Sequence, residues 1–190
     1  MTRIRLLLPF WMNDANVDAV AQHRGWPFVE ARPATEAARE AIWMTADQQT
    51  FINYVADFGL QLHYVVVQGQ EAEEVAGELE REFPVIGREA VLGMVAAADT
   101  RDTLIHAIYH IAAAAREDRE DPELFAAIER LFAHPEADVR RAAVFACTYA
   151  AWPSFREPLR RLAEQDADAD VRAIAQATLD SLTSHAWQGG

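Results

Sequence analysis

A tripeptide that occurs twice constrains this chain more than any other feature. Asp138-Val139-Arg140 recurs 32 residues later as Asp170-Val171-Arg172, and each copy opens an alanine-rich amphipathic run. Sequence periods of this size are typical of helical repeats that stack side by side, because one repeat cannot bury its apolar face alone. The period predicts an all-α C-terminal part, and it favours a binding protein over an enzyme.

A third run extends the pattern towards the N-terminus. It opens at Asp102, 36 residues before Asp138, and keeps the aspartate but lacks the arginine. Two further helices are expected between the three runs, over 122–133 and 155–164, the first with Asp121 as its cap and proline at its first position. Residues 99–182 are therefore predicted to form two full helical hairpins and one partial hairpin, followed by a flexible tail over 183–190.

At these residues the chain resembles HEAT-like repeats of the phycobilisome-lyase type. The Asp-Val-Arg-Xaa-Ala-Ala opening of that family matches residues 138–143 well, and 170–175 less well because Ile174 replaces an alanine. The resemblance implies that the second helix of each pair lines a concave face. It also implies a structural role, capping repeats and bridging neighbouring ones, for four residues: Asp138, Arg140, Asp170 and Arg172.

The first 98 residues carry strand signals and are expected to form a small α+β domain. The last three of five expected strands are joined by short, turn-like segments, which predicts an antiparallel meander with its last strand central and well covered. Helices with a periodic apolar face are expected to cover the sheet. The expected strands are 4–12, 26–31, 41–45, 51–56 and 60–68, and the expected helices are 17–23, 71–83 and 89–98.

The charge of the chain excludes one common class of partner. The net charge is −13, all 17 positive residues are arginine, and the acidic excess is spread over both halves of the chain. A nucleic-acid-binding protein normally carries a basic stripe, so no nucleic-acid partner is expected. Two interpretations of the acidity stay open: a well-solvated surface, or an acidic face that steers a basic protein partner.

The chain is expected to be cytoplasmic. Its one cysteine, Cys147, excludes an intramolecular disulfide and suits a reducing compartment. The apolar run at 4–12 is interrupted by Pro9, which favours a buried strand over a signal peptide. No stretch approaches the roughly 20 apolar residues of a membrane span, so no membrane partner is expected.

Three patterns resemble catalytic or metal sites without completing one. His106 and His110 lie four apart on an expected helix, but no further ligand accompanies them. Residues 166–170 imitate the start of a calcium loop, which then lacks its glycine and its bidentate glutamate. Cys147 lies inside a helix without a paired base. The sequence therefore predicts no catalytic residue, no metal and no cofactor.

One stripe of side chains is predicted to bind a partner. Arg141, Phe145 and Tyr149 are spaced four apart on the expected helix, and Trp152 follows at the junction with the next turn. Exposed Tyr, Trp and Arg are frequent anchors of protein interfaces. The alternative is that the next repeat simply covers this stripe.

The sequence thus predicts a non-enzymatic protein-binding module. The favoured version is an immunity or inhibitor protein that neutralises a cognate toxin or enzyme, such as a basic nuclease. One alternative is a scaffold or regulatory subunit of an enzyme assembly. Another is a lyase-like enzyme, which is suggested only by the repeat family and would need Cys147 as a nucleophile.

Overall fold

The computed structural model describes residues 2–32 and 35–185, and the chain divides into two compact units, residues 1–87 and 88–190. This division lies before the expected boundary at 98. The reason is that helix α3 (Arg88–Ala97) packs against the helices that follow it, α4 (Arg101–Ala114) and α5 (Pro122–Leu131). The helix expected at 89–98 therefore belongs to the helical unit.

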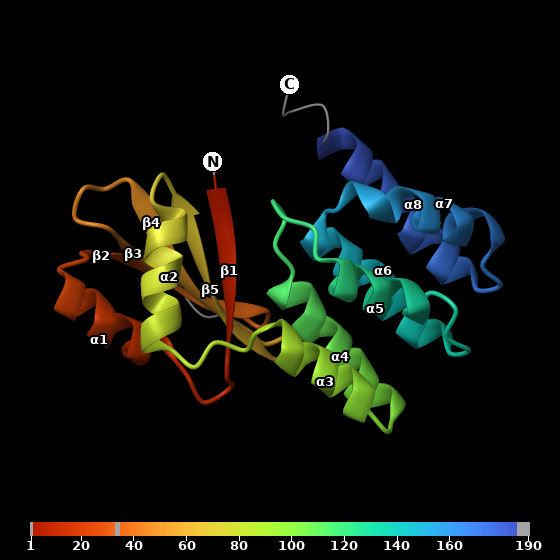
Figure 1. The fold of residues 1–190 in the computed structure, drawn as a ribbon, viewed down its shortest axis with the longest axis horizontal. Coiled ribbons are helices and arrows are strands. Elements are labelled where there is room, and N and C mark those ends of the chain that lie inside the picture. Colours follow the sequence, from red (N-terminus) through yellow and green to blue (C-terminus); the bar gives the residue numbers. More distant parts are fainter. Residues whose placement is uncertain (1, 33–34, 186–190) are drawn as a thin grey trace. The chain divides into compact units, whose positions relative to one another are not determined.

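The first unit contains a five-stranded antiparallel sheet with the order β1-β5-β4-β3-β2 (Figure 1). The predicted meander is confirmed as β3-β4-β5, and β5 is central because β1 pairs along its other edge. The α+β class of this part of the chain is thereby confirmed. The strands are β1 (Thr2–Leu8), β2 (Phe28–Arg32), β3 (Ala38–Met44), β4 (Thr50–Asp57) and β5 (Leu62–Gly69).

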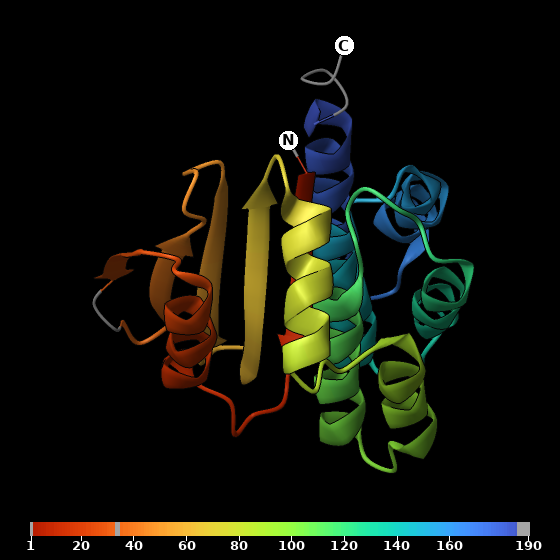
Figure 2. The same cartoon turned by 60° about the vertical axis from the view of Figure 1, so that its left-hand side comes forward.

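Two helices, α1 (Asp14–Arg24) and α2 (Ala72–Glu82), cover one face of this sheet (Figures 1 and 2). Alternate residues of β1, beginning with Ile4, point into the core between sheet and helices. Val17 of α1 and Leu79 of α2 enter the same core and are fully buried. Trp43, also in this core, donates its indole N–H to Asp18 at 3.0 Å.

The first strand is shorter than the sequence predicts. Its pairing with β5 ends at Leu8, and the chain then turns, with the Met12 N–H donating to the Pro9 carbonyl at 3.0 Å. Asn13 caps α1 by accepting from the Ala15 N–H, and α1 ends at Gly25 in the left-handed conformation. The apolar run at 4–12 is thus a strand followed by a turn.

The second unit is helical throughout its described residues, 88–185, without a strand among them. Helix α6 (Ala137–Ala150) packs against α4, α5 and α8 (Ala169–His185), and α8 packs in turn against α7 (Arg156–Gln165). A short 3-10 helix, η1 (Pro153–Phe155), connects α6 to α7. Small residues on α6 allow this close packing, since Ala142, Ala143 and Ala146 are all buried.

The helix bounds test two predictions. Asp121 caps α5 through the backbone N–H groups of Glu123 and Leu124, with Pro122 as the first helical residue, as expected. The prediction of a flexible tail over 183–190 is wrong for residues 183–185, because α8 continues to His185. Residues 186–190 lie outside the described residues. None of the described helices is both long enough and apolar enough to cross a bilayer.

Candidate functional site

The predicted stripe on α6 is only partly assembled as expected. Arg141, Phe145 and Tyr149 lie along the helix and are each partly exposed. The rings of Phe145 and Tyr149 are tilted against each other with centroids 5.4 Å apart. Tyr109 of α4 meets Phe145 edge-on at 5.6 Å. The structure thus brings together three aromatic side chains from two helices, which we call the aromatic row (Tyr109, Phe145 and Tyr149).

Trp152 does not belong to this surface, and its predicted exposure is wrong. The residue before it, Ala151, adopts the left-handed conformation with φ 52°, and this ends α6 and turns the chain inwards. Trp152 is only 1% exposed and stacks on Phe155 at 5.6 Å with nearly parallel rings. Its indole N–H donates to the Arg116 carbonyl at 2.6 Å. The side chain is therefore a core anchor with a satisfied donor.

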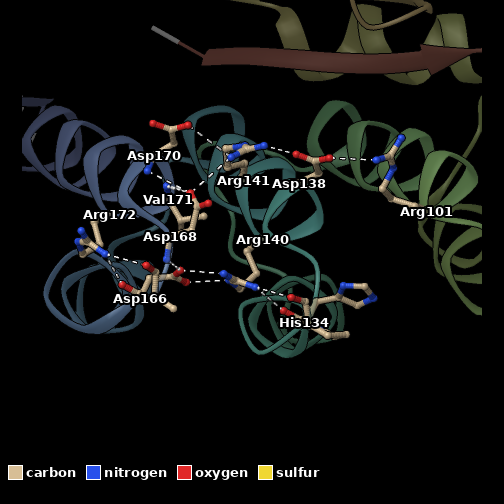
Figure 3. A network of polar contacts seen from close by, with 12 residues as sticks. Arg101, His134, Asp138, Arg140, Arg141, Asp166, Asp168, Asp170, Val171 and Arg172 are labelled. Atoms are coloured by element: carbon tan, nitrogen blue, oxygen red, sulfur yellow. Dashed lines mark hydrogen bonds and ion pairs between the residues drawn. The ribbon is translucent and has the colours of Figure 1, made fainter.

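Arg141, at one end of the row, is held by carboxylates (Figure 3). It pairs with Asp138 one turn earlier and lies 3.4 Å from Asp168, just before α8, and 3.7 Å from Asp170, in the first turn of α8. Arg101 of α4 reaches the same Asp138 at 3.2 Å. All these side chains are partly solvated, so each pair contributes little alone, and their joint effect is to fix the orientation of the Arg141 guanidinium.

A second arginine, Arg140, makes the best-formed ion pair of the helical unit. Its Nε and Nη2 each donate to the Asp166 carboxylate at 2.8 Å, and its Nη1 donates to the carbonyls of His134 and Pro135. The side chains are 12% and 4% exposed, respectively, for Arg140 and Asp166. Bidentate pairs of this geometry are among the stronger charged hydrogen bonds. The pair connects the loop before α6 to the loop before α8.

Hydrogen bonding governs the protonation of Asp166. The donation from Arg140 lowers the pKa of this carboxyl below its ordinary value, and desolvation opposes that shift only in part. The backbone N–H of Asp168 also donates to Asp166 at 2.9 Å. Asp166 is consequently ionised at neutral pH, as the pairing requires.

Arg172 repeats half of this arrangement. Its Nη1 donates to the carbonyls of Asp166 and Ala167 at 2.7 and 3.1 Å, in the same way that Arg140 binds its own preceding loop. Within the described part of the chain, no carboxylate pairs with Arg172 as Asp166 does with Arg140. Figure 3 places Arg172 at the end of the chain of contacts that runs through Asp166 and Arg140.

The two repeated aspartates are not helix caps, which corrects the role predicted for them. Helix α6 begins after Glu136, so Asp138 lies inside its first turn and serves as an ion-pair partner. For α8 the capping acceptor is Asp168, which receives the N–H groups of Asp170 and Val171 at 3.0 Å each. Asp170 itself is largely exposed. A helix boundary two residues earlier than expected explains both differences.

The cysteine and histidines considered as a possible nucleophile and possible metal ligands contribute to packing instead. Cys147 is fully buried, and burial raises the pKa of its thiol far above the ordinary value, which opposes thiolate formation. His110 is buried, its Nδ1–H donates to the His106 carbonyl at 2.9 Å, and its ring packs edge-on against the His106 ring at 4.4 Å. Desolvation lowers the pKa of His110. In the described residues no three such side chains cluster to hold a metal ion.

His63 of β5 has a structural partner in the sheet unit. Its Nδ1 lies 2.6 Å from the Met12 carbonyl and 2.9 Å from the Tyr54 hydroxyl, which also donates to Met12 at 3.2 Å. Desolvation, followed by the nearby charge of Asp14, raises the pKa of Tyr54 to about 12. The phenol therefore stays protonated and keeps the turn before α1 in place.

Comparison with known proteins adds no relative to this description. Neither the family models, nor the curated proteins, nor the solved structures contain a match to the chain.

Proposed function

We propose that this chain is a non-enzymatic, cytoplasmic protein-binding module that neutralises a basic toxin or enzyme. The observation that carries the proposal is the aromatic row, in which Tyr109, Phe145 and Tyr149 come from two helices and remain partly exposed. Aromatic side chains held in mutual contact lose little entropy on binding, and they dominate interface energetics.

We further propose that α4 to α8 form a short array of HEAT-like repeats. The support is the recurrence of one local arrangement at a fixed period: Arg140 and Arg172 each bind two carbonyls of the loop before their own helix. The contacts of α6 with α4 and α8 fit nearest-neighbour stacking. In such an array the second helices form one surface, and the aromatic row lies on two of them.

The charge of the chain favours a basic partner. With a net charge of −13, the protein produces a negative field that accelerates encounter with a positively charged protein. Arg141 lies at the end of the aromatic row, but its charge is offset by the carboxylates of Asp138 and Asp168. A complex formed through this surface is therefore expected to weaken as salt rises.

The test is affinity for a candidate partner, such as the protein encoded beside this one. The variant Tyr109→Ala/Phe145→Ala is expected to weaken binding by about 2 kcal/mol or more, as for interface anchors. The matched control is Thr148→Ala, which removes an exposed side chain between Phe145 and Tyr149 on the same helix. Calorimetry of all three proteins is the measurement. Equal affinity of the folded double variant and the control contradicts the assignment of this surface.

A further inference from the structure

Three strongly exposed aromatic side chains lie at one end of the sheet. Phe10 is 81% exposed, Trp11 58% and Phe58 48%. Phe10 and Trp11 belong to the connection between β1 and α1, and Phe58 belongs to the turn between β4 and β5. Apolar side chains of this size, exposed together, mark a contact surface more often than a solvated one.

The strand register places these two connections side by side. Leu8, the last residue of β1, pairs with His63, and Asp57, the last residue of β4, pairs with Leu62. Both strands therefore end at the same end of β5, which lies between them. Neighbouring strands are about 4.8 Å apart, so the connections are close enough to touch one partner. We call Phe10, Trp11 and Phe58 the aromatic tip.

The turn that carries Phe10 and Trp11 is fixed on both sides. The Met12 N–H donates to the Pro9 carbonyl at 3.0 Å, which makes Phe10 and Trp11 the two central residues of a β-turn. Met12 is only 2% exposed, and its carbonyl receives the Tyr54 hydroxyl and lies beside His63. The two aromatic side chains are thus presented outwards by a turn whose neighbours are buried.

The residue types at these positions are not explained by folding. The central positions of β-turns favour proline, glycine, asparagine, aspartate and serine, because these residues suit the backbone angles or bond to the backbone. Phe10 and Trp11 supply neither advantage, and each leaves a large apolar surface in water. A local departure from turn chemistry, with no folding gain in view, is the pattern expected of a functional surface.

The charges beside the aromatic tip indicate which kind of molecule can bind there. Asp57 ends β4, and Glu36 adjoins Ala37, whose carbonyl accepts the Phe58 N–H. Asp14 and Arg39 also lie nearby, but they form an ion pair with each other and add no net charge. An acidic rim opposes an anionic membrane surface, and it also opposes the same tip of a second copy. It is complementary to a protein pocket with a basic rim.

We propose that the aromatic tip inserts into an apolar pocket with a basic rim on a partner protein. Phe10 and Trp11 provide the inserted side chains, Phe58 extends the contact along the end of the sheet, and Glu36 and Asp57 face the rim. This surface lies entirely in residues 1–87, so the inference is independent of the aromatic row in the helical unit.

The first experiment identifies what the tip touches. A benzophenone amino acid replaces Trp11 in the full-length protein, and cross-links are formed in the cells that produce it. The control carries the same group at Phe51, an aromatic residue that is 41% exposed near the opposite end of β4. We expect one dominant second protein to be cross-linked at position 11 and not at 51. Cross-links to lipid, to a second copy of this chain, or to nothing overturn the inference.

The second experiment measures affinity for the purified cross-linked protein. Phe10→Ser/Trp11→Ser places turn-compatible residues in the same backbone, so folding is expected to be preserved, and the Kd is expected to rise at least 10-fold. Phe58→Ser is expected to raise it several-fold, and Phe51→Ser less than 2-fold. An unchanged Kd for the folded double variant overturns the inference.

The outcomes separate this surface from the aromatic row. If only the serine variants weaken binding, the aromatic tip contacts the partner and the assignment of the aromatic row as the binding surface is wrong. If only Tyr109→Ala/Phe145→Ala weakens binding, the aromatic row contacts the partner and the inference about the aromatic tip is overturned. Binding of the wild-type protein to vesicles of 30% anionic lipid, lost in Phe10→Ser/Trp11→Ser, also overturns the inference, because it replaces the protein pocket with a membrane.

Discussion

Arg140 and Arg172 occupy equivalent positions in the sequence and differ in what they bind. Both follow an Asp-Val pair, and both donate Nη1 to two carbonyls of their own preceding loop. Among the residues that the structure describes, only Arg140 of the two also binds a carboxylate, that of Asp166, through two 2.8 Å bonds. A short motif therefore determines the contact with its own loop. The contact with the neighbouring helix pair depends on a residue 26 positions further along the chain.

The largest effect should distinguish the two arginines. Arg140→Ala leaves the Asp166 carboxylate, which is only 4% exposed, without its bidentate partner, and we expect a loss of about 2 kcal/mol in the free energy of unfolding. Arg172→Ala removes carbonyl contacts alone and should cost about 1 kcal/mol or less. Urea unfolding of both variants is the measurement. Equal losses would show that the carboxylate contributes nothing.

The second test uses pH to measure how much the Asp166 carboxylate contributes to the stability of the folded protein. Because the folded-state pKa of Asp166 is lowered, its stabilisation is complete above the ordinary value of 3.8 and is lost as the pH falls through the folded-state value. Asp166→Asn lacks this titration. The wild-type advantage over Asp166→Asn should therefore shrink on going from about pH 6 to pH 3. Thermal unfolding across this range checks it, and an advantage that is independent of pH contradicts the pairing.

A smaller effect should distinguish the aspartates that precede or begin α6 and α8. Asp168→Ala removes a cap that accepts two backbone N–H groups and should cost about 1 kcal/mol in the free energy of unfolding. Asp138→Ala removes only partly solvated ion pairs with Arg101 and Arg141, so we expect about 0.5 kcal/mol or less. A reversed order in urea unfolding would restore Asp138 to the role of a cap.

The smallest effect is expected at Cys147. Because burial raises the pKa of its thiol and closes off access, a thiol reagent should not modify the native protein at neutral pH, and should do so after unfolding. Mass spectrometry after brief treatment is the measurement. Rapid modification of the native protein would make the nucleophile hypothesis tenable again.

Local patterns allowed much of the fold to be predicted from the sequence. The turn-like segments between the expected strands correctly predict the meander, and Asp121-Pro122 correctly predicts the start of α5. The sequence predicts too late a start for α6, because an aspartate before an apolar run is typical of a cap, whereas Asp138 lies inside the first turn. Burial of Trp152 depends on Ala151 in a left-handed conformation, which alanine rarely adopts and no pattern predicts.

The candidate sites were less predictable because their members are distant in sequence. Tyr109 meets Phe145 across two helices, and no spacing within one helix relates them. Likewise Asp166 resembled part of a failed calcium loop rather than a partner of Arg140. For Phe10 and Trp11 a signal was present in Pro9, which marks the end of the strand, but the apolar run that contains it favoured continuous burial.

Arg140 binds two loops at once, and this limits the insertions and deletions that the chain can tolerate. Its guanidinium donates to a backbone carbonyl of the loop before α6 and to the Asp166 carboxylate in the loop before α8. A change in the length of either loop would therefore break one of these hydrogen bonds. The connection between α4 and α5 contributes no atom to that guanidinium contact. Length variation among relatives should accordingly accumulate in that connection, while the two linked loops evolve at constant length.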